Sequence, residues 1–166
     1  MYHIYTGEGK GKTTAALGQA LRALGAGKKV HMLQFVKGMA YSEISVIEGL
    51  DNFTYELLGQ DCFIDKKPDG EDILRAARGL EKAAHLLEEQ SYDMLILDEL
   101  HIAIYLGLLE LQEVVRVVEK AGNTELITTG RYAPLELIER ADLVTEMREV
   151  KHYYTKGIEA RKGIEF

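Results

Sequence analysis

The sequence has few of the features that extracellular, membrane-bound or nucleic-acid-binding proteins need. Cys62 is the single cysteine, so no intramolecular disulfide can form, and a zinc site built from cysteines is not expected. No apolar run is long enough to cross a bilayer, and no signal peptide is visible. The formal net charge of −7 argues against a large nucleic-acid footprint, which requires a basic face. We therefore expect a cytoplasmic protein without membrane or nucleic-acid partners.

The chain instead shows strand-like and helix-like segments in alternation. Its 166 residues are the size of one domain, and its 46% hydrophobic content is ample for one core. No linker divides it, so we expect a single nucleotide-binding domain over residues 1–166. The alternation predicts an α/β fold with a mainly parallel central sheet. The expected strands are 2–5, 29–36, 53–58, 94–97, 126–129 and 143–147, and the expected helices are 13–24, 42–50, 71–89, 111–120 and 134–141.

The stretch from Tyr5 to Thr14, YTGEGKGKTT, is typical of a phosphate-binding loop between a strand and a helix. Glycines let the backbone approach an anion with its N–H groups pointing into one concavity. The N-terminus of the following helix adds partial positive charge. We expect Lys12 to contact phosphates and the Thr13 hydroxyl to ligate Mg²⁺. The predicted nucleotide-binding residues are Gly7, Glu8, Gly9, Lys10, Gly11, Lys12, Thr13 and Thr14.

The loop departs from the usual pattern by one residue. Thr6 holds the position of the first glycine, so the loop counted from Gly7 is one residue short. A glycine-rich turn before a helix is the alternative interpretation. The short loop also argues against assuming the nucleotide pose of an ordinary ATPase.

Polar residues follow several expected strands, where ligands bind in open α/β sheets. They are Lys12 and Thr13, Gln34 and Lys37, Asp98 and Glu99, Thr129 to Arg131, and Lys151 and His152. Asp98 and Glu99 end the apolar run Met94–Leu97 and are candidates to hold Mg²⁺ directly or through water. The alternative for this acidic pair is a strand-ending turn or a surface ion pair.

The roles of single basic residues are less specific. Arg131 is suited to clamp a phosphate or a carboxylate, but a surface position is equally compatible with the sequence. Arg22 lies nearly three turns into the first helix and either reaches back to a nucleotide or is solvated. The histidines show no metal-binding spacing, and no Ser-His-Asp or Cys-His pattern is present. His101 lies near the expected site, although a structural role is favoured for it.

Residues 6–18, TGEGKGKTTAALG, resemble the opening of the P-loop corrinoid adenosyltransferases of vitamin B12 synthesis and salvage. The similarity continues through QFVKG at 34–38, LDEL at 97–100, TGR at 129–131 and ADLVTEM at 141–147. It also covers VKH at 150–152 and the C-terminal GIEA and GIEF segments at 157–160 and 163–166. The short loop is itself part of the family pattern.

This resemblance implies a P-loop NTPase (RecA-like) three-layer fold and a homodimer. It implies transfer of the 5′-deoxyadenosyl group from ATP to the Co(I) of a corrinoid, with release of triphosphate. Lys12, Thr13 and Glu99 would be catalytic, and Arg22 and Arg131 would lie near the nucleotide or the substrate. Mg²⁺, with Mn²⁺ as an alternative, would be held by residues drawn from Thr13, Asp98 and Glu99.

One departure concerns the corrinoid. Typical members carry a Phe-x-Trp segment after the third strand that helps Co(II) to be reduced, and this chain has no tryptophan. Phe63 is the candidate to fill part of that role, and Gln34, Lys37 and His101 are further candidates for corrinoid contact. A flavoprotein is the expected reductant. A P-loop ATPase or kinase-like phosphohydrolase, or a non-catalytic nucleotide-binding regulator, are the alternatives to the transferase.

Overall fold

The computed structural model describes residues 1–38, 41–59 and 68–166. A six-stranded sheet in the order β3-β2-β4-β5-β1-β6 forms its centre, and every strand pair is parallel. The strands are β1 Tyr2–Thr6, β2 Val30–Gln34, β3 Phe53–Leu57, β4 Met94–Asp98, β5 Glu125–Thr129 and β6 Leu143–Glu146. The predicted α/β class with a parallel sheet is therefore confirmed.

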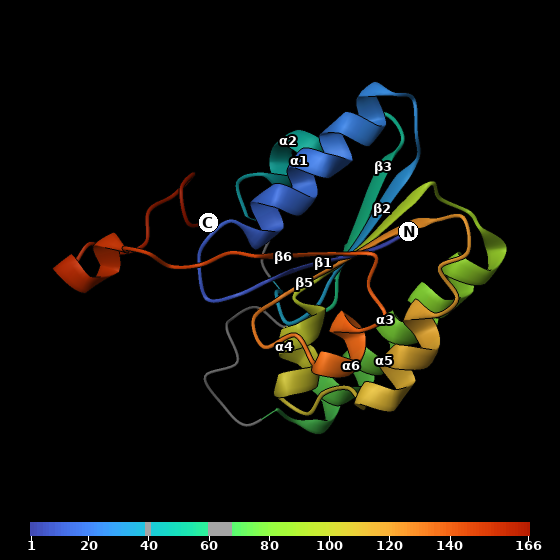
Figure 1. Cartoon of the computed structure of the whole chain (residues 1–166). Coiled ribbons are helices and arrows are strands. Elements are labelled where there is room, and N and C mark those ends of the chain that lie inside the picture. The colour runs from blue at the N-terminus through green and yellow to red at the C-terminus, as the bar shows by residue number, and fades with distance from the viewer. Residues whose placement is uncertain (39–40, 60–67) are drawn as a thin grey trace.

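Helices cover both faces of the sheet and make three layers (Figure 1). One face carries α1 Lys12–Gly25 and α2 Ile44–Ile47. The other carries α3 Gly70–Glu89, α4 Leu100–Tyr105, α5 Leu111–Val118 and α6 Leu135–Ile138. A short 3-10 helix, η1 Tyr153–Lys156, lies in the C-terminal arm. No helix in the described ranges is long and apolar enough to cross a membrane.

Two apolar cores follow from the alternation of side chains along the buried strands. In β4, Met94 and Ile96 pack with α1 and α2, whereas Leu95 and Leu97 pack with the helices of the other face. Because both faces of β4 are covered, all five of its residues are buried. This burial extends to Asp98, and it brings a carboxylate to the carboxyl edge of the sheet without exposing it.

Element boundaries differ from the expectations where local signals are weak. The helices expected at 42–50 and 134–141 are only single turns, Ile44–Ile47 and Leu135–Ile138. The second strand is shorter than 29–36, and α4 was not expected at all. This helix begins directly after Asp98 and Glu99, and its six residues are too few to show a clear helical period. Most of the interval 59–70, for which neither strand nor helix was expected, lies outside the described residues.

Candidate active site

The loop from Gly7 to Gly11 joins β1 to α1 and packs against the chain that follows β6. Gly7 and Gly11 have φ values of 96° and 117°, in the region that favours glycine. The Gly9 N–H donates to the Met147 carbonyl at 2.6 Å. A Cβ atom at Gly7 or Gly9 would lie 2.5 or 2.7 Å from that same carbonyl oxygen. These two glycines are thus needed for contact with Met147, a constraint that the sequence pattern did not reveal.

Lys12 folds into the loop instead of extending into solvent. Its ammonium group donates to the carbonyls of Gly7 at 2.7 Å and Gly9 at 2.8 Å, and its side chain is buried. Burial lowers the pKa of Lys12, against the opposing attraction of Glu99. A desolvated ammonium at the N-terminus of a helix is a strong electrostatic site for an anion.

Asp98 is the centre of a hydrogen-bond cluster and has no exposed surface. It accepts bonds from the hydroxyl groups of Thr13 at 2.8 Å and Thr129 at 2.6 Å. It also accepts from the Gln34 amide at 2.9 Å and the Lys37 ammonium at 3.1 Å. Burial alone would raise the pKa of Asp98, but Lys37 and these hydrogen bonds bring it below the usual value. A surface ion pair, the alternative interpretation of this residue, is therefore excluded.

Glu99 lies beside this cluster in a different electrostatic state. Its backbone has a φ of 56°, and its N–H donates to the Thr129 hydroxyl at 3.0 Å. Burial and the negative charge of Asp98 raise the pKa of Glu99. A non-glycine residue at positive φ is uncommon and is often found at functional sites. The end of β4 thus carries Asp98, whose lowered pKa favours the ionised form, and Glu99, whose raised pKa disfavours it.

The structure brings some of the remaining nucleotide-binding candidates to the loop and separates others. Arg131 forms an ion pair with Glu8 at 3.2 Å, so both lie at the loop, while Thr14 is exposed in the first turn of α1. Lys10 also lies at the loop, but its ammonium group is bound by the C-terminal segment. Arg22 is exposed in the last turn of α1, about 15 Å along the helix axis from Lys12. Within this chain, Arg22 does not reach back to the loop, which was one of the two roles expected from the sequence.

The candidates for corrinoid contact require correction. His101 is fully buried, and its ring nitrogens contact the Thr128 hydroxyl at 2.9 Å and the Gly130 carbonyl at 3.1 Å. Because both nitrogens are occupied inside the protein, the expected corrinoid contact by His101 is wrong for this structure. Gln34 and Lys37 are buried or nearly so and support Asp98 instead. Phe63 lies outside the described residues.

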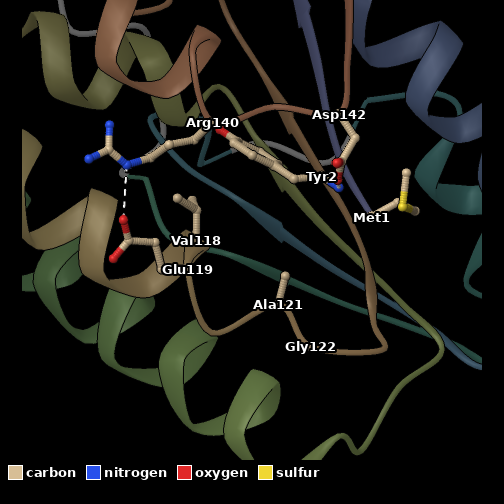
Figure 2. A pocket seen from close by; sticks show the side chains of 8 residues that line it. All are labelled: Met1, Tyr2, Val118, Glu119, Ala121, Gly122, Arg140 and Asp142. Atoms are coloured by element: carbon tan, nitrogen blue, oxygen red, sulfur yellow. Dashed lines mark hydrogen bonds and ion pairs between the residues drawn. The ribbon is translucent and has the colours of Figure 1, made fainter.

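A cavity of about 260 Å³ lies away from this site (Figure 2). It is lined by Tyr2, Arg140 and Asp142 among others, at the end of β1 opposite to the loop. Ligands of parallel α/β sheets bind at the carboxyl ends of the strands. The loop and the carboxylate cluster therefore remain the candidate site.

Comparison of the sequence with known proteins places the chain in a family. Residues 1–166 match the family described as ATP:corrinoid adenosyltransferase BtuR/CobO/CobP. The chain belongs to this family of ATP:corrinoid adenosyltransferases. The corrinoid adenosyltransferase of Sinorhizobium sp. is 38% identical, and the alignment covers 98% of this chain and 78% of the relative. The corrinoid adenosyltransferases of Pseudomonas aeruginosa and Escherichia coli K12 are 37% and 36% identical over 98% of this chain, and 82% and 84% of their own lengths are covered.

Membership of the adenosyltransferase family agrees with the P-loop NTPase type of fold described above. The description of the family names ATP and a corrinoid, and it does not name a metal ion. Among the described residues, no group of three or more histidine, cysteine, aspartate or glutamate side chains forms a preformed metal cage. The oxygen atoms of Thr13, Asp98 and Glu99 are nevertheless the donor type that Mg²⁺ prefers.

Proposed function

We propose that this chain transfers the 5′-deoxyadenosyl group of ATP to the Co(I) ion of a corrinoid and releases triphosphate. The observation that carries the proposal is the match to corrinoid adenosyltransferases along the whole chain. The geometry supports it, because the phosphate-binding loop and the acidic strand end meet through the 2.8 Å contact between Thr13 and Asp98.

The residues of the loop have a defined task in this reaction. The bond from cobalt to C5′ forms while the bond from C5′ to O5′ breaks, and the electron pair of that bond leaves with the triphosphate. Lys12 and the loop N–H groups are positioned to stabilise the charge that grows on this leaving group. Since Co(I) is itself the nucleophile, the protein needs no catalytic base. Its other task is to orient C5′ towards cobalt and exclude water.

A magnesium ion, or manganese in its place, belongs to the proposal. Mg²⁺ is usually held by one or two carboxylates together with substrate phosphates. Thr13 and Glu99 would supply protein oxygens directly, and Asp98, whose oxygens already accept four hydrogen bonds, would act through water. The bound ion would neutralise phosphate charge. The raised pKa of Glu99 fits this role, since a nearby cation would stabilise a carboxylate whose charge is disfavoured by burial and by its neighbour Asp98.

We also propose that the protein acts in the cytoplasm as a homodimer. A flavoprotein would reduce the cobalt of its corrinoid substrate to Co(I). Support for self-association comes from β6, which lies at the edge of the sheet with all four residues exposed. Leu143 and Val144 keep 42% and 41% of their surface accessible there. An open strand edge with apolar side chains is prone to pair with another chain. Sedimentation equilibrium would test the dimer directly.

Product analysis with ATP, Mg²⁺ and chemically reduced cobalamin tests the function. We expect triphosphate together with an adenosylated corrinoid, seen as a change in the visible spectrum. Release of ADP and phosphate without corrinoid would instead identify a phosphohydrolase. ATP binding without turnover in the presence of reduced corrinoid would identify a nucleotide-binding regulator.

A further inference from the structure

The C-terminal residues 161–166 fold back to the phosphate-binding loop, and the C-terminal end lies near the start of α1 (Figure 1). The Lys10 ammonium donates to the Ile164 carbonyl at 2.5 Å and to the Glu165 carboxylate at 2.8 Å. One of the two lysines of the loop is therefore bound to an anion of the same chain. This contact joins positions that are almost a full chain length apart.

A second attachment fixes the far end of this segment. The Ser42 hydroxyl donates to the Phe166 carbonyl at 2.9 Å, and the rings of Tyr41 and Phe166 lie 6.4 Å apart. Tyr41 also lies 5.1 Å from the ammonium group of Lys37. Residues 161–166 thus extend from the loop to the residues beside the carboxylate cluster.

The Glu165 carboxylate lies in a small site of its own. It accepts hydrogen bonds from Lys10, from the Tyr153 hydroxyl and from the backbone N–H of Arg161. The bonds from Lys10 and Tyr153 hold the pKa of Glu165 far below its usual value, and Glu165 raises the pKa of Lys10. Glu165 therefore places an anion on one of the two lysines of a loop that is expected to receive a phosphate.

We propose that Glu165 competes with the triphosphate of ATP for Lys10, so that loading of the loop releases residues 161–166 from its mouth. The inference rests on the proposed function, which assigns the loop to triphosphate. A carboxylate with one negative charge is replaced by a group with several, and the ammonium of Lys10 favours the more highly charged partner. Glu165 thus affects nucleotide binding indirectly, through its contact with Lys10.

Release of this segment requires little free energy. The side chains of Lys10 and Glu165 are 41% and 18% exposed, and ion pairs at the surface contribute little to stability. Ile164 and Phe166 keep 53% and 44% of their surface accessible, so little apolar area holds the segment down. The contacts that hold the segment at Lys10 are therefore weak enough for a more highly charged group to displace.

Calorimetric titration with inorganic tripolyphosphate tests the competition without any corrinoid. We expect Glu165→Gln to bind tripolyphosphate about two- to tenfold more tightly than the wild type, because removal of the charge abolishes the competing ion pair. Glu159→Gln is the matched control, since Glu159 is an exposed glutamate of the same arm. It should bind like the wild type.

Hydrogen exchange supplies a second readout that does not depend on the variant. The N–H groups of Gly163, Ile164 and Glu165 are bonded within the segment, and they should exchange faster in the wild type once tripolyphosphate is added. The proposed competition would be overturned if Glu165→Gln bound tripolyphosphate no more tightly than the wild type. It would also be overturned if hydrogen exchange in the wild type did not change when tripolyphosphate was added. A wild type that bound neither tripolyphosphate nor ATP would overturn the proposed function as well, so the two failures are distinguishable.

Discussion

The ammonium group of Lys37 lies 3.1 Å from a carboxylate oxygen of Asp98, a side chain with no exposed surface. The same ammonium lies 3.9 Å from Glu99, so one cation serves two carboxylates. The side chain of Lys37 is itself only 13% exposed. Removal of one member of such a pair leaves the other as an uncompensated buried charge.

We therefore predict that Lys37→Gln and Asp98→Asn each lower the free energy of unfolding by about 3 kcal/mol. The double variant should lose clearly less than the sum of the two, because no unpaired charge remains between these positions. Urea unfolding of the four proteins without ligand measures the coupling. Strictly additive losses would show that the two side chains do not stabilise each other.

Lys12→Ala should weaken ATP binding by about 100-fold or more, since hydrogen bonds to a charged group contribute about 1.5–3 kcal/mol each. Calorimetry with ATP and Mg²⁺ measures the loss, and circular dichroism checks the fold. Lys28→Ala is the control, because Lys28 is an exposed lysine beyond the other end of α1. Near-normal affinity of Lys12→Ala would argue against the assignment of the loop.

Acid should destabilise the protein through two buried histidines. Burial lowers the pKa of His101 and of His31 to about 4, whereas an unfolded histidine titrates near the ordinary value of 6.5. Between these pH values the unfolded chain binds more protons than the folded one. The contribution of the two neutral histidines to the free energy of unfolding is therefore fully present above pH 6.5, and it is lost as the pH falls towards 4. Each residue should account for about 3 kcal/mol over this range.

The variant His101→Asn should show about half of this loss, whatever its stability at neutral pH. His85→Asn is the matched control, because the side chain of His85 is 68% exposed. Chemical unfolding at several pH values gives the slope. An identical pH dependence for His101→Asn and the wild type would contradict a neutral, buried imidazole.

Substitution by alanine should have opposite effects on stability at two helical glycines. A Cβ atom added at Gly18 in α1 would have no heavy atom within 4 Å, so Gly18→Ala should raise stability by about 0.5–1 kcal/mol through helix propensity. At Gly79 in α3, a Cβ would clash with Leu58 Cδ1 and lie 3.2 Å from Leu58 Cγ. Because Leu58 is buried, its side chain has little room to move aside, and overpacking costs about 1–3 kcal/mol.

Thermal unfolding of both alanine variants checks the pair, with Gly18→Ala melting above the wild type and Gly79→Ala below it. Shifts in the same direction would show that helix propensity alone decides both sites.

The sequence was informative where local pattern and function coincide. The strand, loop and helix around Lys12 and the acidic end of β4 were located correctly, because their signals lie within short segments. The gathering of polar residues at the carboxyl edge of the sheet was also expected, and the bonds that Asp98 accepts confirm it, but the individual contacts were not predicted. Gln34 and Lys37 were candidates for corrinoid contact, yet they hold Asp98, and nothing in their own segment of sequence shows which residue of β4 they contact. His101 has the structural role that the sequence favoured and not the corrinoid contact, since its ring is buried against Thr128 and Gly130 at the end of another strand.

The contact between Gly9 and Met147 has a consequence for how the protein emerges from the ribosome. Among the described strands, β1 pairs with β5 and β6, which follow the other four strands in the chain, so the first strand waits for its neighbours until these have been synthesised. Met147 closes the loop only after β6 has been synthesised. A chain that lacks β6 and Met147 is thus unable to complete its nucleotide cradle, and we expect ATP to bind only after this segment has emerged.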